Sequence, residues 1–328
     1  MPIGLPRLFI GVNCIGYTDV RLGSPSSLPA YRNRASMVYT GFMQNSHNPP
    51  GIDPAKIKAF ALDLDGTCLG GNASLSDRTI HALQTCLHRG IQVIICTGRS
   101  IDAAEPYRLA IGATGPMVYF NGAEVVDMPS ETTVKATLLS LEVVDYCVDL
   151  SRRQGHYYQV YFPGTPEHPR GILMAEHQAQ ETEMYRIHTG IQAMRGDLKQ
   201  ALAQPGLKGG VKGMFIAEPW FHENIRSQLV ERFGRGIYIT RTARTFLEIM
   251  DAGVSKGMGL RCALAYQGLQ DAPVMAFGDE ENDLPLFEAA TYAAAPANAK
   301  ESVLRAADIQ FGPNTEDGLA ALLEQLFG

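Results

Sequence analysis

The sequence lacks the features that would place the chain in a specialised class of protein. No apolar run approaches the ~20 residues of a membrane-spanning helix, and there is no internal repeat or low-complexity segment. A net charge of -6 without a basic stripe argues against a nucleic-acid surface. The six cysteines include no Cys-x-x-Cys pair, which predicts reduced thiols in a cytosolic compartment. There is also no Gly-x-x-x-x-Gly-Lys-Ser/Thr loop for a nucleotide.

Length and composition are those of an ordinary globular protein. The 328 residues suffice for two domains, and 45% are hydrophobic and 19% charged. From Ile57 onwards short apolar strands alternate with helices, which predicts βαβ units and a parallel sheet. We expect strands at 60–64, 92–96, 117–120, 274–277, 292–295 and 308–311, and helices at 76–89, 101–110, from 256, 300–307 and 317–327.

The middle of the chain, 139–241, has a different pattern. Its candidate strands alternate polar and apolar residues and are rich in aromatic residues, which is typical of an antiparallel sheet. The strand-helix rhythm resumes afterwards, so we expect an α+β cap domain inserted into a Rossmann-like three-layer α/β core of 57–138 and 242–328. In the cap, strands are expected at 156–162, 171–176, 213–217 and 236–240, and helices near 141–154 and 221–233.

Residues 1–56 are rich in Gly, Pro, Ser and Asn and lack periodicity. Their excess of basic over acidic residues is a feature of targeting peptides. However, the apolar stretch 8–15 contains glycine and asparagine, and no clear cleavage site follows it. We therefore expect a disordered extension, or an upstream start codon with Met37 or Met43 as the true start.

The stretch Lys58–Thr67 organises the predicted core. Its apolar run is too short for a helix and predicts a buried strand, after which Asp63 and Asp65 share one face. Carboxylates held so close repel one another unless a cation compensates them. An EF-hand calcium loop is excluded, because its glycine belongs at the sixth position and its glutamate at the twelfth, where this chain has Ser74. A turn whose aspartates only accept from backbone amides remains an alternative for this stretch taken alone.

Polar residues also follow three other predicted strands. Thr97, Asn121 and Asp279 each come just past a strand's carboxyl end, the edge at which open α/β sheets bind ligands. Lys256 begins a predicted helix, where a cation is poorly placed against the helix dipole, and this indicates an anion nearby. Together these groups are what phosphoryl transfer requires besides a divalent cation, and hard oxygen ligands suit Mg²⁺.

Four stretches follow one another in a defined order: Asp63-Leu64-Asp65-Gly66-Thr67, Thr97-Gly98-Arg99, Lys256 and Gly278-Asp279-x-x-Asn282-Asp283. They resemble the four motifs of the haloacid dehalogenase superfamily of phosphatases. Asn121-Gly122-Ala123, Glu248-Ile249-Met250 and the large insert narrow the resemblance to Cof-like, type IIB-capped sugar-phosphate phosphatases. It covers about 57–328. Two features depart from the family pattern: Cys68 replaces a usual leucine, and the usual Met-Gly is missing before Asn298.

The resemblance implies a role for each matched residue. Asp63 would be the nucleophile that forms an aspartyl-phosphate, and Asp65 the general acid and then the general base. Mg²⁺ would be held by the Asp63 carboxylate, the Asp65 carbonyl and Asp279, with Glu280 or Asp283 in support. The phosphate would be held by the amides of Leu64 and Gly98 and by Thr97, Lys256 and Asn282.

The expected function is hydrolysis of small phosphorylated metabolites, sugar phosphates above all. We expect a cytoplasmic monomer or weak homodimer that binds neither nucleic acid nor membranes. A sugar phosphomutase of the phosphomannomutase type, with similar motifs and a similar cap, is an alternative. So is a cap-mediated regulatory protein with a vestigial site, although the retained carboxylates and lysine count against it. Candidates for contacts with the leaving group are Arg99, Asn121, Tyr185, Arg186 and His188.

Overall fold

The computed structural model describes residues 52–328, so the expectations for residues 1–51 lie outside the described residues. Residues 52–56, predicted to belong to the disordered leader, are part of the folded core. The Asp53 side chain caps a short 3-10 helix η1 (Pro54–Lys56) by accepting from the amide of Ala55 at 3.2 Å. Ile52 is buried against the core, so the predicted end of the leader at 56 is wrong.

The core is built on a five-stranded parallel sheet in the order β16-β15-β14-β1-β2. Successive side chains of a strand point to opposite faces. In β1, Phe60 and Leu62 therefore enter one hydrophobic cluster, while Ala59 and Ala61 enter another on the opposite face. The strands are β1 (Ala59–Leu62), β2 (Gln92–Ile95), β14 (Val274–Phe277), β15 (Tyr292–Pro296) and β16 (Ile309–Phe311).

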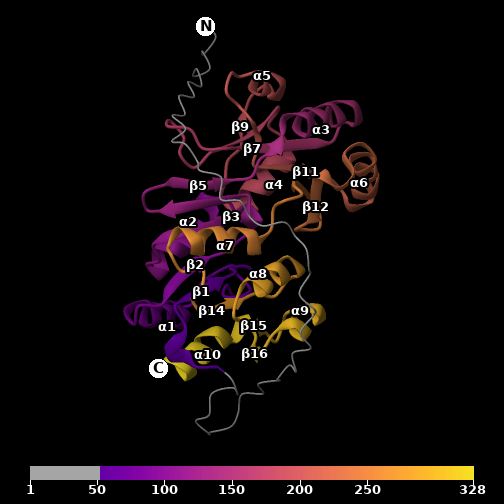
Figure 1. Cartoon of the computed structure of the whole chain (residues 1–328). Helices are drawn as coiled ribbons and strands as arrows, with labels where there is room; N and C mark the ends of the chain where they lie inside the picture. Colours follow the sequence, from indigo (N-terminus) through magenta and orange to yellow (C-terminus); the bar gives the residue numbers. More distant parts are fainter. Residues whose placement is uncertain (1–51) are drawn as a thin grey trace.

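Helices cover both faces of this sheet, so the predicted three-layer Rossmann-like core is confirmed (Figure 1). The first face carries α1 (Asp77–His88), α2 (Ile101–Ile111) and α10 (Gly318–Phe327), and the second carries α7 (Lys256–Tyr266), α8 (Leu284–Ala289) and α9 (Glu301–Ala306). The local sequence sets where these helices begin. Ser76 and Ser100 are N-caps, accepting from the amides of Thr79 at 3.1 Å and Ala103 at 3.4 Å.

The third predicted strand of the core differs from expectation. β3 (Gly115–Tyr119) pairs with β4 (Glu124–Met128), which pairs with β5 (Thr132–Ala136), in a separate antiparallel sheet. β3 joins β2 only through an isolated parallel bridge between Cys96 and Val118. The reversal into β4 follows from three consecutive residues with positive φ, Phe120, Asn121 and Gly122. No sequence periodicity revealed this hairpin.

The insert folds around a six-stranded sheet in the order β12-β13-β11-β7-β8-β9. Helices α3 (Leu141–Gln154) and α6 (Pro219–Phe233) pack on one face through residues such as Val144 and Leu229. The other elements are β6 (Leu139–Ser140), β7 (Tyr157–Phe162), β8 (Ile172–Ala175), α4 (Gln180–Thr189), β9 (Met194–Arg195), α5 (Leu198–Leu202), β10 (Gly209–Gly210), β11 (Lys212–Ile216), β12 (Ile237–Arg241) and β13 (Phe246–Asp251). Of these, β6, α4, β9, α5, β10 and β13 were not predicted from the sequence.

The predicted boundary of the cap at 241 divides this sheet. β13 lies beyond 241, yet it pairs antiparallel with both β11 and β12. The sequence analysis identifies Glu248-Ile249-Met250 only as part of a family motif, and the strand that contains these residues depends on pairing with distant parts of the chain. The strand pairing places Glu248 on the cap side of the molecule.

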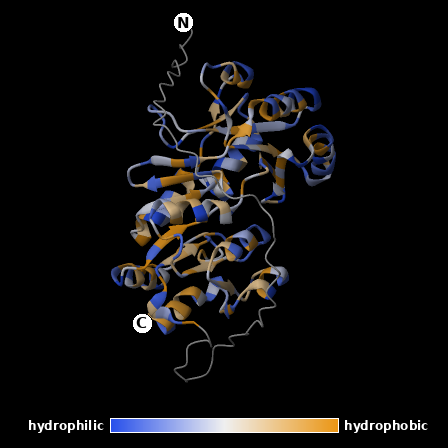
Figure 2. Ribbon diagram, viewed as in Figure 1, coloured by the Kyte–Doolittle hydropathy of each residue, from blue (hydrophilic) through white to orange (hydrophobic). Residues whose placement is uncertain are grey.

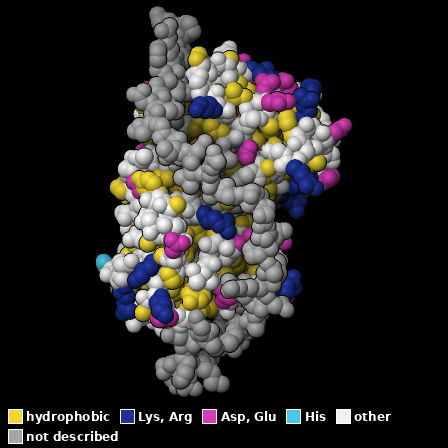
Figure 3. All heavy atoms as spheres, viewed as in Figure 1, with side chains coloured by type: hydrophobic (Ala, Val, Ile, Leu, Met, Phe, Trp, Pro, Cys, Tyr) yellow, Lys and Arg dark blue, Asp and Glu magenta, His cyan; other side chains and the backbone are white. Residues whose placement is uncertain are grey.

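The two parts are stacked along the long direction of the molecule, with α3, α5 and α6 at one end and α1 and α10 at the other (Figure 1). Hydrophobic colouring is concentrated along strands at the centre, whereas helices at the edge of the cap alternate between blue and orange (Figure 2). Charged side chains of both signs lie side by side on the cap surface (Figure 3). One ion pair of the cap joins Arg232 to Glu142 at 3.0 Å. None of the helices within 52–328 has the length and hydropathy of a membrane span.

Substitution of Phe60 tests the contribution of aromatic packing to the stability of the core. Its side chain is fully buried, and its ring makes edge-on contacts with Phe277 at 5.4 Å and Phe327 at 5.3 Å between centroids. We expect Phe60→Ala to lower the free energy of unfolding by about 3–5 kcal/mol, measured by urea denaturation. The control is Phe221→Ala on α6, where the ring is 40% exposed and a loss below about 1 kcal/mol is expected. Equal losses in the two variants would contradict this account of the core.

Candidate active site

The strand β1 delivers the first carboxylate to the edge of the sheet. The amide of Asp63 still donates to the carbonyl of Phe277 at 3.1 Å, so Asp63 directly continues the ladder between β1 and β14. The chain then turns through Gly66, whose φ of 77° lies in the left-handed region. A side chain at Gly66 would collide with the carboxylate of Asp279. This glycine therefore leaves room for the carboxylate of Asp279, which follows the neighbouring strand β14, beside the turn after β1.

Three buried carboxylates meet at this edge. Asp63, Asp279 and Asp283 each offer an oxygen atom within 4.8 Å of the others. Thr67 lies between two of them, with Oγ1 3.1 Å from Asp63 Oδ2 and 3.0 Å from Asp279 Oδ1. Sequence reasoning gave Thr67 no role. Its signal was its position four residues after Asp63, where the turn brings its hydroxyl back to the carboxylate.

Lys256 is the cation of the cluster. Its Nζ lies 2.5 Å from Asp63 Oδ1 and 2.7 Å from Asp283 Oδ1, and its side chain is only 2% exposed. Burial alone would lower the pKa of Lys256, but the attraction of Asp283 and Asp63 raises it above the usual range. The lysine is therefore charged. One positive charge faces three carboxylates, and all four side chains are buried.

The excess of negative charge contributes to raised pKa values of two carboxyl groups. Burial raises the pKa of Asp63 well above its ordinary value, Lys256 opposes the shift, and Asp283 and Asp279 add to it. Burial and the charge of Asp283 raise the pKa of Asp279 to about 6. Such a set of carboxylate oxygens fits a small divalent cation, which would relieve the repulsion.

The predicted metal residues do not all meet in this cluster. Asp283 Oδ2 accepts from the amides of Asp279 at 3.0 Å and Glu280 at 3.1 Å, while its Oδ1 faces Lys256. Asp283 therefore holds the loop and the lysine in place. The carboxylate of Glu280 forms an ion pair with Lys300 at 2.7 Å and is half-exposed. Glu280 lines the cleft but lies outside the group of three carboxylates.

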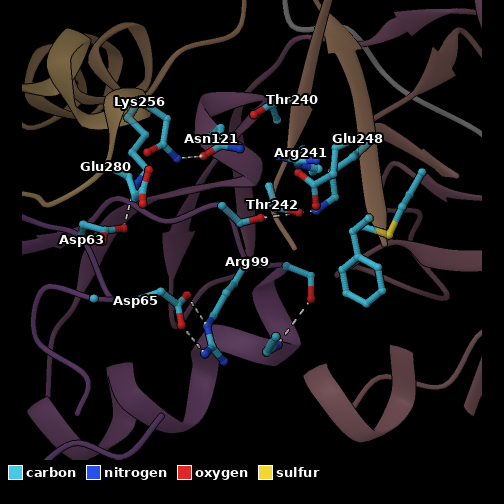
Figure 4. A pocket seen from close by; sticks show the side chains of 18 of the residues that line it. Asp63, Asp65, Arg99, Asn121, Thr240, Arg241, Thr242, Glu248, Lys256 and Glu280 are labelled. Atoms are coloured by element: carbon cyan, nitrogen blue, oxygen red, sulfur yellow. Dashed lines mark hydrogen bonds and ion pairs between the residues drawn. The ribbon is translucent and has the colours of Figure 1, made fainter. Parts of the chain in front are cut away.

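The second predicted catalytic residue has a different environment. Asp65 is 57% exposed, and its oxygens accept from Arg99 Nη2 at 2.6 Å and Nε at 2.8 Å. The guanidinium of Arg99 also lies over the ring of Tyr107, 5.1 Å from the centroid. The carboxylate of Asp65 thus faces the open cleft and not the buried cluster (Figure 4).

Several donors predicted to bind phosphate surround Asp63. Among the described residues, the amides of Leu64 and Gly98 donate to no backbone or side-chain acceptor. Asn121 Oδ1 accepts from Asn282 Nδ2 at 3.0 Å, while Asn121 Nδ2 is buried without a partner. A buried donor left unpaired is costly, and an anion at this place would satisfy it. Asn121, expected at the edge of the sheet, is therefore part of the candidate phosphate site.

A cleft of about 870 Å³ between core and cap gives access to these groups. Figure 4 shows Asp63, Asn121 and Lys256 on one side and Thr240, Arg241 and Glu248 of the cap on the other. Of the cap residues expected to contact a leaving group, Tyr185 and His188 line the cleft. Arg186 does not, because it pairs with Glu183 at 2.6 Å on the surface.

The family model for haloacid dehalogenase-like hydrolases matches residues 60–323. The chain belongs to this family. The resemblance inferred from the four motifs is therefore confirmed.

Relatives and solved structures agree with this family. The chain is 31% identical to the 5-amino-6-(5-phospho-D-ribitylamino)uracil phosphatase YitU of Bacillus subtilis, over 82% of this chain and 97% of the relative. It is 26% identical to the pyridoxal phosphate phosphatase YbhA of Escherichia coli, over 81% and 97%. The structure of TM0651 from Thermotoga maritima matches with a TM-score of 0.72 and 26% identity, covering 82% and 97% of the two chains.

Asp279 provides a test of the charge cluster through the pH dependence of stability. Its folded pKa of about 6 lies above the ordinary value of 3.8, so the folded protein binds this proton more tightly than the unfolded chain does. The ionised carboxylate therefore weakens the fold above about pH 6, and this effect disappears below about pH 4. Asp279→Asn keeps an oxygen for Thr67 and removes the charge.

Without metal, we expect Asp279→Asn to be more stable than the unchanged protein by about 1–3 kcal/mol at about pH 7.5, with the difference vanishing near pH 4. Urea denaturation in EDTA across this pH range measures it. Asp271→Asn, at an exposed position, is the control and should show no such difference. An Asp279→Asn variant that is less stable than the unchanged protein at about pH 7.5 would overturn the account of repulsion.

Proposed function

We propose that this chain is a magnesium-dependent phosphomonoesterase that acts on small phosphorylated metabolites through an aspartyl-phosphate on Asp63. The observation that carries the proposal is the buried group of Asp63, Asp279 and Asp283 with Lys256, at the bottom of a cleft beneath the cap. Family membership supports a hydrolase, and the relatives YitU and YbhA are named phosphatases. We propose a cytosolic enzyme that is a monomer or weak homodimer.

The oxygen donors of the site fit Mg²⁺. Asp63 and Asp279 would hold the ion by their carboxylates, and Asp65 by its backbone carbonyl. When bound, Mg²⁺ would neutralise charge on the phosphate and bring it close to the carboxylate of Asp63. Asp283 would support this arrangement by orienting the loop that begins at Asp279.

In the first step, an oxygen of Asp63 forms a bond to phosphorus, and the bond between phosphorus and the leaving oxygen breaks. The electron pair goes to the leaving oxygen, which takes a proton from Asp65. The amides of Leu64 and Gly98, with Thr97, Asn121 and Lys256, bind the phosphate oxygens during this step. Asp65 must turn from Arg99 to reach the leaving group, because both of its oxygens face the guanidinium.

In the second step, water attacks the phosphorus of the phosphoenzyme. The water gives a proton to Asp65, the bond to Asp63 breaks, and inorganic phosphate and the free carboxylate result. The exposed position of Asp65 suits this alternation between acid and base, since it faces the cleft through which the leaving group departs. Asp63 is buried, and its shielding from solvent limits direct attack of water on the substrate before the phosphoenzyme has formed.

We propose sugar and polyol phosphates as the first substrates to test. By its name, YitU acts on a compound with a phosphorylated ribityl chain. The volume of the cleft is sufficient for a small metabolite. A panel of sugar phosphates, nucleotides and pyridoxal phosphate, ranked by kcat/KM, tests the proposal. Formation of an isomerised sugar phosphate instead of inorganic phosphate would indicate a phosphomutase, and no change in any compound would indicate a binding protein.

Activity should depend on magnesium. EDTA should abolish the release of phosphate from p-nitrophenyl phosphate, and added Mg²⁺ should restore it. Ca²⁺ should substitute poorly, because its looser coordination misplaces the nucleophile. Full activity after exhaustive removal of metal would rule out the metal site proposed for Asp63 and Asp279.

Substitution of the two leading aspartates should separate their roles. Asp63→Asn removes the nucleophile, so no phosphoenzyme forms and activity vanishes. Asp65→Asn leaves the nucleophile and removes proton transfer, which contributes about 10²–10⁴-fold to the rate. With p-nitrophenyl phosphate the leaving group needs little protonation, so phosphorylation of Asp63 should be largely spared while hydrolysis is slow.

The Asp65→Asn variant should therefore accumulate an acid-stable, hydroxylamine-sensitive phosphoenzyme, detected by rapid quench. Asp63→Asn is the matched control, since it makes the same chemical change two residues away. The assignment of roles is wrong if Asp65→Asn shows no intermediate, or if both variants show it equally.

A further inference from the structure

A buried ion pair in the cap has no part in the reaction described above. Lys212 of β11 and Glu248 of β13 lie 2.7 Å apart, and their side chains are 3% and 5% exposed. Removing two charges from water is costly, and well-packed apolar residues often serve the fold equally well or better. The stability of the cap is therefore a weak explanation for this pair.

The lysine of the pair reaches from the cap into the core. Its Nζ donates to the carbonyl oxygen of Gly98 at 3.4 Å, a long but charge-assisted contact. The same nitrogen lies 5.4 Å from the ring centroid of Phe120 in the core and 5.8 Å from that of Tyr161 in the cap. The two rings are themselves in contact, with their centroids 4.8 Å apart. These rings flank the ammonium group and attract its charge.

The carbonyl that Lys212 holds belongs to the peptide group between Gly98 and Arg99. The amide of this peptide group, on Arg99, donates to Thr97 Oγ1 at 3.1 Å. Because Oγ1 accepts this hydrogen, its own hydrogen points elsewhere and is available to a phosphate oxygen. The carbonyl of this peptide group thus contacts the cap, and its N–H orients the hydroxyl of Thr97.

We propose that Lys212 is a positioning residue for phosphate binding, which holds the Gly98–Arg99 peptide group from the cap and thereby aims the Thr97 hydroxyl at the phosphate. This inference rests on the proposed function, in which Thr97 and Gly98 bind phosphate. It makes docking of the cap a condition for a complete phosphate site. Glu248 keeps the ammonium group of Lys212 aligned with the Gly98 carbonyl.

A competing role exists for the same pair. Glu248 Oε2 is buried without a hydrogen-bond partner, and Glu248 lines the cleft. A carboxylate oxygen in that position would suit a hydroxyl group on the leaving group. The two roles differ in the substrates that they affect. Positioning of the Gly98–Arg99 peptide group acts on every phosphate ester alike, whereas recognition of a hydroxyl acts only on substrates that carry one.

Orthovanadate is the probe that separates these roles, because it occupies a phosphate site and carries no leaving group. The variant is Lys212→Met combined with Glu248→Leu, which removes both charges together and leaves no unpaired ion in the cap. We expect the inhibition constant of vanadate to rise about tenfold, the effect of one lost hydrogen bond. kcat/KM should fall by a similar factor for both p-nitrophenyl phosphate and ribitol 5-phosphate.

Lys199→Met is the matched control, since Lys199 is a cap lysine that pairs with Asp145 and Asp149 and does not line the cleft. It should leave the inhibition constant of vanadate unchanged. Lys212→Arg keeps the charge and hydrogen-bond donors in a larger group, and it should bind vanadate more tightly than the double variant. If the double variant does not fold, Lys212→Gln replaces it, with the same direction of change expected.

Two results would overturn the proposal. Unchanged vanadate inhibition in a folded variant lacking the lysine would show that Lys212 does not position the phosphate site. A loss confined to ribitol 5-phosphate would show that the pair recognises hydroxyl groups. Failure of the proposed function is distinct from both, because the unchanged protein would then neither release phosphate from these esters nor bind vanadate.

Discussion

The architecture of the site depends on how the fold offsets the repulsion among three carboxylates that are buried with a single lysine. Asp63, Asp279 and Asp283 come from two neighbouring strand ends, and the fold brings them together although their charges oppose it. Features around them offset this cost. Lys256 reaches two of the carboxylates, Thr67 lies between two, and backbone amides donate to Asp283. Two glycines, Gly66 and Gly278, leave the space in which the acidic groups approach, since a side chain at either would collide with one.

Two aspartates that are only two residues apart in the sequence lie in different environments. Asp63 lies below the surface beside Lys256, and Asp65 lies in the open cleft beside Arg99. A strand exit followed by a turn produces this difference, because the chain leaves the sheet at Asp63 and turns at Gly66. One carboxylate is thus shielded and the other accessible. The proposed division between a nucleophile and a proton donor rests on this difference in exposure.

Polar and aromatic groups of the cap contact the core next to the phosphate site. Lys212 reaches the carbonyl of Gly98, and Tyr161 contacts Phe120, the neighbour of Asn121. On the outer side, Arg170 joins the cap to Asp102 at 2.9 Å and to Glu131 at 2.7 Å. Gly98 and Asp102 lie in the segment that follows β2, Phe120 follows β3, and Glu131 lies in the turn between β4 and β5. A change in the position of the cap would therefore act on the segments that carry Thr97, Gly98 and Asn121.

The sequence by itself determined the strand-helix rhythm of the core and the residues at the ends of its strands, because apolar periodicity and strand-exit position are local properties. The tertiary structure decided what depends on contacts between distant residues. The turn after Asp279 directs Asp283 inward to Lys256 and leaves Glu280 to Lys300, although both were equivalent acidic candidates. Likewise, β3 leaves the parallel sheet and β13 joins the cap because of strands with which they pair. Lys212 and Glu248, 36 positions apart, meet only because β11 and β13 are neighbours in one sheet.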